Sequence, residues 1–284
     1  MLKIWISGSN GQIGKAINSV LEPLQFEVFN TDKDEVDIAD VDEVFRFGEV
    51  NRPDIIINCS GVTDMDYCEA NPKEAYRVNA IGARNLSIVA RKIDAKIVQI
   101  STDDVFDGKS TKPYKEFDTP NPRTVYGKSK LAGENYVKEF THKHFVIRST
   151  WVYGKGNNYI FDLLEAVKTG KPVAVAADQF GAPTSAKELA KFVLHIVSGR
   201  EYGTYHATCK GTCSRYAYAK EILKMTGKTA KLKAVPTLES DLTSVRPAYA
   251  VLDGFIMDIV HVYEFLSWKE SLEEFLREEG LYEQ

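Results

Sequence analysis

Short apolar segments alternate with longer helical patterns along the first half of the chain. The apolar segments span residues 3–7, 26–30, 54–60, 95–101 and 144–149, and stretches with helical spacing, such as 74–93, lie between them. Continuous apolar strands that alternate with helices indicate a parallel sheet covered by helices on both faces. The pattern therefore predicts an α/β fold with a doubly wound parallel sheet, in which ligands bind at the carboxyl ends of the strands.

Beyond residue 150 the order of elements is less regular, and helical patterns recur. They span residues 159–170, 185–199, 214–227 and 267–280. We expect residues 1–150 to hold the sheet and residues 151–284 to form a smaller, mostly helical lobe that binds the substrate. This lobe would close over the carboxyl edge of the sheet, and some of its segments would return to the sheet.

Composition and charge narrow the class of protein. The chain has 284 residues, of which 44% are hydrophobic and 27% charged, and its formal net charge is −4. This balance is ordinary for a globular protein, and the lack of a basic block argues against nucleic acid as a partner. No stretch approaches the roughly 18 apolar residues of a membrane span, and the first residues leave no room for a secretory leader. We therefore expect a cytoplasmic protein.

Cysteine usage supports the same compartment. The four cysteines are too few and too scattered for a disulfide framework in a chain of this length. Cys209 and Cys213 lack a second Cys or His pair at zinc-binding spacing. We therefore expect no metal site.

A glycine-rich segment, GSNGQIG, lies between the first predicted strand and the first predicted helix. It contains Gly8, Gly11 and Gly14. In this position, backbone amides at the start of a helix can bind a pyrophosphate. Asp32 and Lys33 follow the second strand; Asp32 would bond the ribose 2′-hydroxyl of NADH, whereas Lys33 would meet the 2′-phosphate of NADPH. The segment predicts a dinucleotide site open to either cofactor, and a structural turn with solvated charges is the alternative.

A tyrosine and a lysine stand four residues apart near the start of a predicted helix. Tyr126 and Lys130 therefore lie on one face of that helix. A tyrosine has a pKa of about 10 and needs a nearby cation to act as an acid–base catalyst at neutral pH. Ser101 or Thr102 would add a hydroxyl at the end of the fourth strand. The combination predicts a proton-relay site beside a nicotinamide, and two solvent-facing side chains are the alternative.

With these motifs the sequence resembles the extended short-chain dehydrogenase/reductase superfamily, and within it the dTDP-4-dehydrorhamnose reductase family. The resemblance covers nearly the whole chain. The glycine segment and the Tyr–Lys pair are shared across the superfamily. More particular to this family are TWVYG (150–154), DQFGAPT (178–184) and RPAYAVLD (246–253).

The resemblance implies a Rossmann-like fold and a reduction with NADPH or NADH. The reaction would convert the C4 ketone of dTDP-4-dehydro-L-rhamnose to dTDP-L-rhamnose, with Thr102, Tyr126 and Lys130 as the catalytic residues. Tyr126 would donate a proton to the carbonyl oxygen as hydride arrives from the nicotinamide. Lys130 would lower the pKa of the phenol and hold the nicotinamide ribose, and Thr102 would bond the same carbonyl oxygen.

The resemblance also implies residues for the substrate and the cofactor. Asp103 would contact the substrate, Trp151 would present an apolar face to the deoxysugar, and Arg246 would lie near the phosphates, although a core tryptophan and an interior salt bridge are alternatives. The expected cofactor-binding residues are Gly8, Asn10, Gly11, Gln12, Ile13, Gly14, Asp32, Lys33, Asp37, Ile38, Gly61, Val62, Thr63, Asn79, Tyr126 and Lys130.

The sequence departs from the family pattern in ways that keep other functions open. The family usually has Tyr where this chain has Asp104, and the resulting Asp103–Asp104 pair is similar to the Asp–Glu pair of nucleotide-sugar 4,6-dehydratases. Tyr249 and Ala250 replace an Asn–Ser pair, which puts the identity of the base in doubt. The alternatives are a dehydratase or epimerase with bound NAD, and a non-catalytic regulatory subunit like the partner of methionine adenosyltransferase. A monomer or a homodimer is expected.

Overall fold

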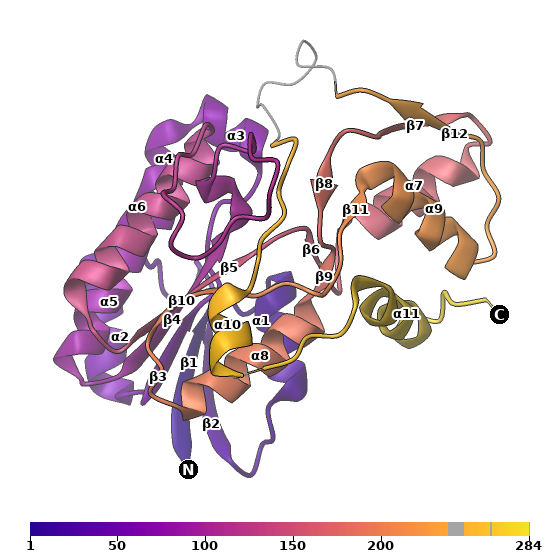
Figure 1. Ribbon diagram of the computed structural model, residues 1–284. Coiled ribbons are helices and arrows are strands. Elements are labelled where there is room, and N and C mark those ends of the chain that lie inside the picture. The colour runs from indigo at the N-terminus through magenta and orange to yellow at the C-terminus, as the bar shows by residue number, and fades with distance from the viewer. Residues whose placement is uncertain (238–246, 262, 284) are drawn as a thin grey trace.

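A parallel sheet forms the centre of the molecule. A computed structural model describes residues 1–237, 247–261 and 263–283 (Figure 1). Within them, the six strands of this sheet follow the order β10-β5-β4-β3-β1-β2, and every neighbouring pair is parallel. Their bounds are β1 (Leu2–Ser7), β2 (Phe26–Thr31), β3 (Ile55–Asn58), β4 (Lys96–Thr102), β5 (His144–Ser149) and β10 (Gly203–His206). The five predicted strands and the doubly wound sheet are confirmed.

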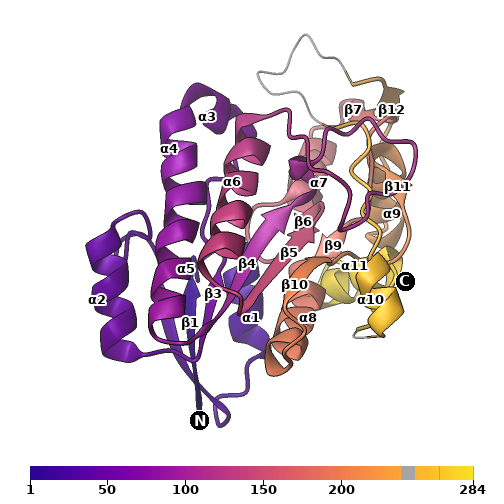
Figure 2. The same ribbon diagram turned by 60° about the vertical axis from the view of Figure 1, so that its left-hand side comes forward.

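Helices cover both faces of the sheet (Figures 1 and 2). Because side chains alternate along a strand, Ile4 and Ile6 of β1 pack into one apolar cluster and Trp5 packs into the other. The first cluster includes residues of α1 (Gln12–Val20) and α8 (Ala186–Ser198). The second includes residues of α2 (Val41–Asn51), α5 (Ala83–Lys92) and α6 (Val125–Phe140). Burial on both faces explains why the strands are continuous apolar runs.

The predicted helix over 74–93 is interrupted. It consists of α4 (Pro72–Tyr76), a π-helical turn η1 (Arg77–Gly82) and then α5. A π-helical turn is uncommon and occurs frequently at functional sites. Asn79 lies inside this one and is buried.

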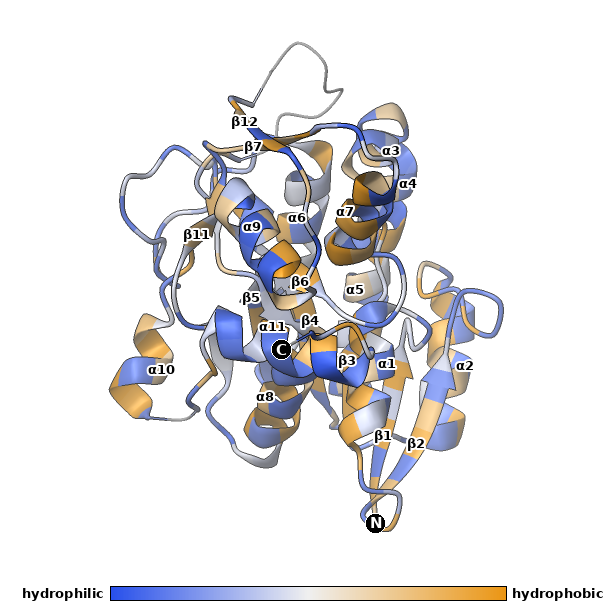
Figure 3. Ribbon diagram, turned by 90° about the vertical axis from the view of Figure 1, so that its right-hand side faces the viewer, coloured by the Kyte–Doolittle hydropathy of each residue, from blue (hydrophilic) through white to orange (hydrophobic). Residues whose placement is uncertain are grey.

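The second half of the chain contributes both to the sheet and to a separate layer. The predicted helices are confirmed as α7 (Tyr159–Lys168), α8, α9 (Arg215–Met225) and α11 (Trp268–Glu278). A short helix α10 (Phe255–Val260) and the edge strand β10 were not predicted. The helices of this half carry both hydrophilic and hydrophobic residues (Figure 3), as expected where one side of a helix is buried. The division of the chain at residue 150 stays a prediction.

Small strand pairs connect the helices of the second half. They are β6 (Val152–Tyr153) with β9 (Thr184–Ser185), β7 (Val173–Ala176) with β12 (Leu232–Val235), and β8 (Phe180–Gly181) with β11 (Cys213–Ser214). Among the described residues, every helix falls short of the length and apolar character that a membrane span requires.

Candidate active site

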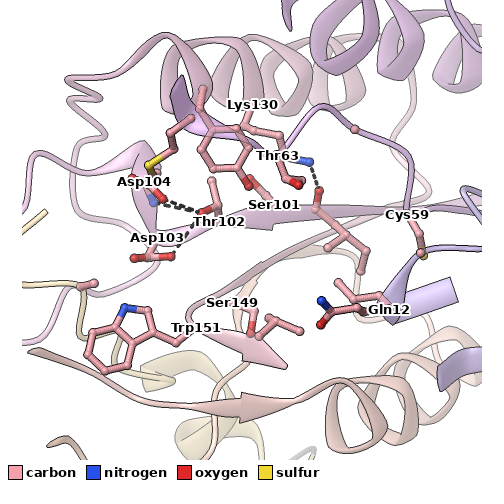
Figure 4. Close-up of a pocket in the computed structure, with 18 of the residues that line it drawn as sticks. Gln12, Cys59, Thr63, Ser101, Thr102, Asp103, Asp104, Lys130, Ser149 and Trp151 are labelled. Atoms are coloured by element: carbon pink, nitrogen blue, oxygen red, sulfur yellow. Dashed lines mark hydrogen bonds between the residues drawn. The ribbon is translucent and has the colours of Figure 1, made fainter. Parts of the chain in front are cut away.

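A cavity of about 480 Å³ opens at the carboxyl ends of β1, β3, β4 and β5 (Figure 4). This is the edge at which doubly wound sheets bind ligands. The first half of the chain lines it with the glycine segment, the loop after β3, the end of β4 and the start of α6. From the second half it is lined by Trp151, Val152, Gln179, Arg215, Pro247 and Ala250.

Each glycine of the GSNGQIG segment occupies its position for a different structural reason. Gly8 has a φ of +76°, and a Cβ there would lie 2.6 Å from the backbone nitrogen of Ser60. A Cβ on Gly14 would lie 2.4 Å from the carbonyl oxygen of Gly8. Gly11 is the N-cap of α1 and supplies no side-chain cap, so amide N–H groups of the first turn are left for a ligand. Gly11, Gln12 and Ile13 all line the cavity.

Asp32 fixes the GSNGQIG segment through hydrogen bonds. Its carboxylate accepts hydrogen bonds from Ser9 Oγ at 2.8 Å and from the backbone nitrogen of Asn10 at 2.9 Å. Lys33 is exposed and lies 4.0 Å from Glu74. Neither residue lines the cavity, so which of them would determine cofactor preference stays a prediction.

The next two predicted cofactor residues also lie outside the cavity. Asp37 accepts a hydrogen bond from Arg77 at 2.8 Å. Burial alone would raise the pKa of Asp37, but the Arg77 guanidinium outweighs burial and the pKa lies below its usual value. Ile38 is buried. It packs closely on Gly82, since a Cβ added to Gly82 would lie 2.4 Å from the Cδ1 atom of Ile38.

Asn79 fixes the loop that follows β3. Its amide nitrogen donates to the carbonyl oxygen of Val62 at 3.0 Å, and its Oδ1 accepts from the Val62 nitrogen at 2.8 Å. The same amide donates to Ser129 Oγ on α6 at 2.9 Å. Gly61 and Thr63, on either side of Val62, line the cavity. Asn79 therefore acts through the backbone it holds rather than by lining the cavity itself.

Thr102, Tyr126 and Lys130 all line the cavity, and Figure 4 shows Thr102 and Lys130 at its wall. Thr102 ends β4, and the other two lie one turn apart on α6, which starts where Thr124 Oγ1 accepts from the Gly127 nitrogen at 3.0 Å. The Thr102 hydroxyl favours the ionised form of the nearby Tyr126 phenol and so opposes the rise in its pKa. Lys130 Nζ donates to the carbonyl oxygen of Ile100 at 2.6 Å.

Burial shifts both titrating groups of this set. Burial raises the pKa of Tyr126, and the charges of Asp104 and Asp103 raise it further. This direction is opposite to the lowering that the resemblance implies. Burial lowers the pKa of Lys130 to about 8. The phenol is therefore protonated at neutral pH, as a proton donor must be.

Two carboxyl groups stand beside Thr102, in the short 3₁₀ turn η2 (Asp103–Val105). Thr102 Oγ1 lies 3.2 Å from Asp103 Oδ1 and 3.3 Å from Asp104 Oδ2, and it accepts from the Asp104 nitrogen at 3.2 Å. Burial and the neighbouring Asp104 raise the pKa of Asp103 well above its usual value. Two adjacent carboxyl groups can act as an acid and a base when their environments differ.

Trp151 also lines the cavity, in a left-handed conformation with a φ of +46°. The guanidinium carbon of Arg215 lies 3.5 Å from the centroid of its ring. The apolar face predicted for a deoxysugar is therefore partly covered by a cation. Arg246 lies outside the described residues.

Several lining residues escaped the sequence analysis. Ser149 ends β5, and its buried Oγ has no hydrogen-bond partner in the described part of the chain. Its place at a strand end was the signal that could have identified it. Gln179 lies within the DQFGAPT segment but was given no role there, and no motif marked Arg215; both reach the cavity only through the folding of the second half.

Comparison with known proteins identifies similar sequences and structures. A family model described as the RmlD substrate binding domain matches residues 2–280. The chain is 36% identical to the spore coat polysaccharide biosynthesis protein SpsK of Bacillus subtilis, over 98% of both proteins. It is 35% identical to the dTDP-4-dehydrorhamnose reductase of Escherichia coli, over 87% of both.

Solved structures of similar proteins include members of the same family. The dTDP-4-dehydrorhamnose reductase of Clostridium acetobutylicum is 41% identical with a TM-score of 0.96, over 98% of this chain and 100% of that one. The Bacillus anthracis enzyme of that name, solved in complex with NADP, is 36% identical with a TM-score of 0.95 and the same coverage. A UDP-glucose 4-epimerase of Thermus thermophilus is only 18% identical, with a TM-score of 0.83 over 97% of this chain and 98% of that one. That likeness shows the fold alone.

Proposed function

The chain belongs to the dTDP-4-dehydrorhamnose reductase family of the extended short-chain dehydrogenases/reductases, and on this premise we propose its reaction. It reduces the C4 ketone of dTDP-4-dehydro-L-rhamnose to dTDP-L-rhamnose with NADPH or NADH. One observation carries the proposal: Thr102, Tyr126 and Lys130 line the same cavity as the amino-terminal turn of α1.

The residues present fit a nicotinamide dinucleotide. Gly8 and Gly14 allow backbone approaches that a side chain would block, and the first turn of α1 has no side-chain cap from Gly11. Gly11, Gln12 and Ile13 would bind the pyrophosphate, and Lys130 the nicotinamide ribose. When bound, the reduced cofactor supplies the hydride that a ketone needs to become an alcohol.

The side chains of the protein would supply the proton. Tyr126 donates it to the developing alkoxide, since the phenol is protonated at neutral pH. Thr102 would hold the same oxygen through its hydroxyl, since it lines the same cavity as Tyr126. The phenolate that remains is stabilised by the Lys130 ammonium, because charges attract strongly in a buried site.

The reaction itself is the first test. Absorbance of the reduced nicotinamide is followed while dTDP-4-dehydro-L-rhamnose is added, once with NADPH and once with NADH. We expect substrate-dependent loss of absorbance with at least one cofactor, and none when dTDP-L-rhamnose replaces the ketone. A folded protein that binds cofactor but consumes neither would contradict the proposed reaction.

The pH dependence of turnover is expected to follow Lys130. Its pKa is lowered to about 8, so the side chain is charged below that pH and neutral above it. Since the charge stabilises the phenolate, turnover should fall as pH rises through about 8. In Lys130→Arg, whose guanidinium stays charged to pH 12 or above, this alkaline decline should disappear from whatever activity remains. Initial rates between pH 6 and about 10 measure it, and a wild-type profile that is flat across this range would contradict the role.

One observation favours a second candidate, a nucleotide-sugar 4,6-dehydratase or epimerase. Asp103 and Asp104 both line the cavity, and the pKa of Asp103 is raised by burial and by its neighbour. Such a pair could shuttle protons on a sugar whose C4 is oxidised by a retained cofactor. Protein purified with bound NAD, and converting a nucleotide sugar without added cofactor, would support this candidate over the reductase.

A further inference from the structure

Arg215 is held against two aromatic rings at the wall of the cavity. Its guanidinium carbon lies 3.5 Å from the ring centroid of Trp151 and 4.8 Å from that of Tyr159. A guanidinium over an aromatic face is attracted to it and keeps the N–H groups at its edges available. Gly181 contacts Trp151 as well, since a Cβ there would lie 2.6 Å from the indole Cε2 atom. The indole is therefore a fixed support for the cation.

The charge of Arg215 is not neutralised by the protein around it. The side chain is half-buried, and within the described residues it makes no ion pair and donates no side-chain hydrogen bond. The Asp103 carboxyl acts on it electrostatically across the cavity but is not in salt-bridge contact. A partly desolvated cation with hydrogen-bond donors and no acceptor is costly, and a bound anion would offset that cost.

The backbone at the start of α9 also favours a bound anion. Arg215 is the first residue of α9, an 11-residue helix capped by Ser214. The helix dipole places partial positive charge at this end, which disfavours a cation and favours a negative group. The dipole and the guanidinium therefore point to the same ligand chemistry.

We propose that Arg215 is a substrate-binding residue that anchors the diphosphate of the nucleotide sugar. The assignment rests on the proposed function, which supplies a substrate with a diphosphate. A phosphate matches the planar fork of a guanidinium, which can donate two parallel hydrogen bonds. Asp103 and Arg215 line the same cavity, so the sugar would lie toward Asp103, Thr102 and Tyr126 while its diphosphate extends toward Arg215.

The placement also assigns a role to Trp151. Rather than offering a free apolar face to the deoxysugar, the indole holds the guanidinium in position. Trp151 would then influence diphosphate binding through Arg215. Its left-handed φ of +46° is unfavourable for a tryptophan, and strained residues of this kind cluster at ligand sites.

Calorimetric titration of the holoenzyme tests the assignment. The protein is saturated with NADP⁺, so that the cofactor's own pyrophosphate site is filled, and dTDP, thymidine and inorganic pyrophosphate are added separately. For Arg215→Gln we expect dTDP and pyrophosphate to bind about 10- to 100-fold more weakly, the loss typical of a hydrogen bond to a charged group. Thymidine should bind equally to both proteins, and Arg215→Lys should be intermediate because it keeps the charge without the fork.

The chain offers a matched control in Lys269. This cation also lies over an indole, 5.4 Å from the ring of Trp268, but it does not line the cavity. Lys269→Gln should leave dTDP and pyrophosphate binding unchanged. NADPH affinity should be unchanged in every variant, which separates loss of a ligand contact from loss of structure.

Two results would overturn the assignment: equal dTDP and pyrophosphate affinity in wild type and Arg215→Gln, or no binding of either probe to wild type. In the turnover assay, Arg215→Gln should raise KM with little change in kcat. A wild-type protein that binds dTDP through Arg215 but reduces no keto-sugar would refute the proposed function and leave this assignment standing. If the wild-type protein reduces the keto-sugar but Arg215→Gln leaves KM unchanged, the proposed function stands and the assignment of Arg215 is refuted.

Discussion

Replacing Tyr126 with phenylalanine is expected to lower turnover by about 10²- to 10⁴-fold, the usual contribution of a positioned general acid. The substitution removes only the hydroxyl, which is the proposed proton donor to the ketone oxygen. The ring keeps its place on α6, so cofactor binding should change little. Single-turnover loss of NADPH absorbance on mixing with the keto-sugar measures the effect on the chemical step.

A second tyrosine on the same helix serves as the control. Tyr136 stacks with Phe140 at a centroid distance of 6.2 Å and does not line the cavity. Tyr136→Phe should retain wild-type turnover. If Tyr126→Phe also stayed within a few-fold of wild type, the proton would have to come from another group, and Asp103 or Asp104 would be the nearest carboxyl groups to examine.

The central sheet could be predicted because its strands are buried on both faces. Ile55, Ile56 and Ile57 of β3 are all buried, so the run is apolar without alternation. The edge strand β10 could not be predicted in this way, since it contains only the residues GTYH and forms because its backbone pairs with β5. The π-helical turn at Arg77–Gly82 was equally hidden, because its residues are compatible with an ordinary helix.

The residues of the candidate site also differ in how far the sequence alone could predict them. The glycine segment, Tyr126 and Lys130 follow fixed spacings, since their geometry is set within one turn or one helix. Arg215 has no such signal: it reaches the cavity only because α9 and Trp151 are brought together by the packing of the second half. Residues positioned by contacts between distant segments leave no local pattern in a single sequence.

A buried ion pair ties α6 to the sheet beneath this site. Glu134 lies one turn beyond Lys130 and accepts hydrogen bonds from Arg148 of β5 at 2.9 and 2.7 Å. Ser101, next to Thr102 on β4, donates to the same carboxylate at 2.6 Å. Both charged side chains are at most 2% exposed. The ion pair therefore joins the helix that carries Tyr126 and Lys130 to β5, and the Ser101 hydrogen bond joins the same helix to β4, which carries Thr102.

Replacing Arg148 with methionine is expected to destabilise the protein by about 3–5 kcal/mol, because it leaves a buried carboxylate without its main partner. The double variant Glu134→Leu/Arg148→Met should recover much of this loss, since apolar residues can fill the same space without an unpaired charge. Urea unfolding of wild type and variants measures the free energy of unfolding. Arg277→Met, which breaks the exposed pair with Glu273, should change it little.

The free energy of unfolding is expected to depend on pH through Glu134. Burial alone would raise the pKa of Glu134, but Arg148 outweighs it and the pKa lies below its ordinary value. In wild type this stabilisation is therefore present above the unfolded pKa of about 4.3 and is lost as pH falls below it. Without Arg148, burial would raise the pKa, and the penalty present at neutral pH would disappear on protonation. The deficit of Arg148→Met should thus narrow between pH 7 and about pH 4, and a constant deficit would show that lost packing, not the unpaired charge, is the cause.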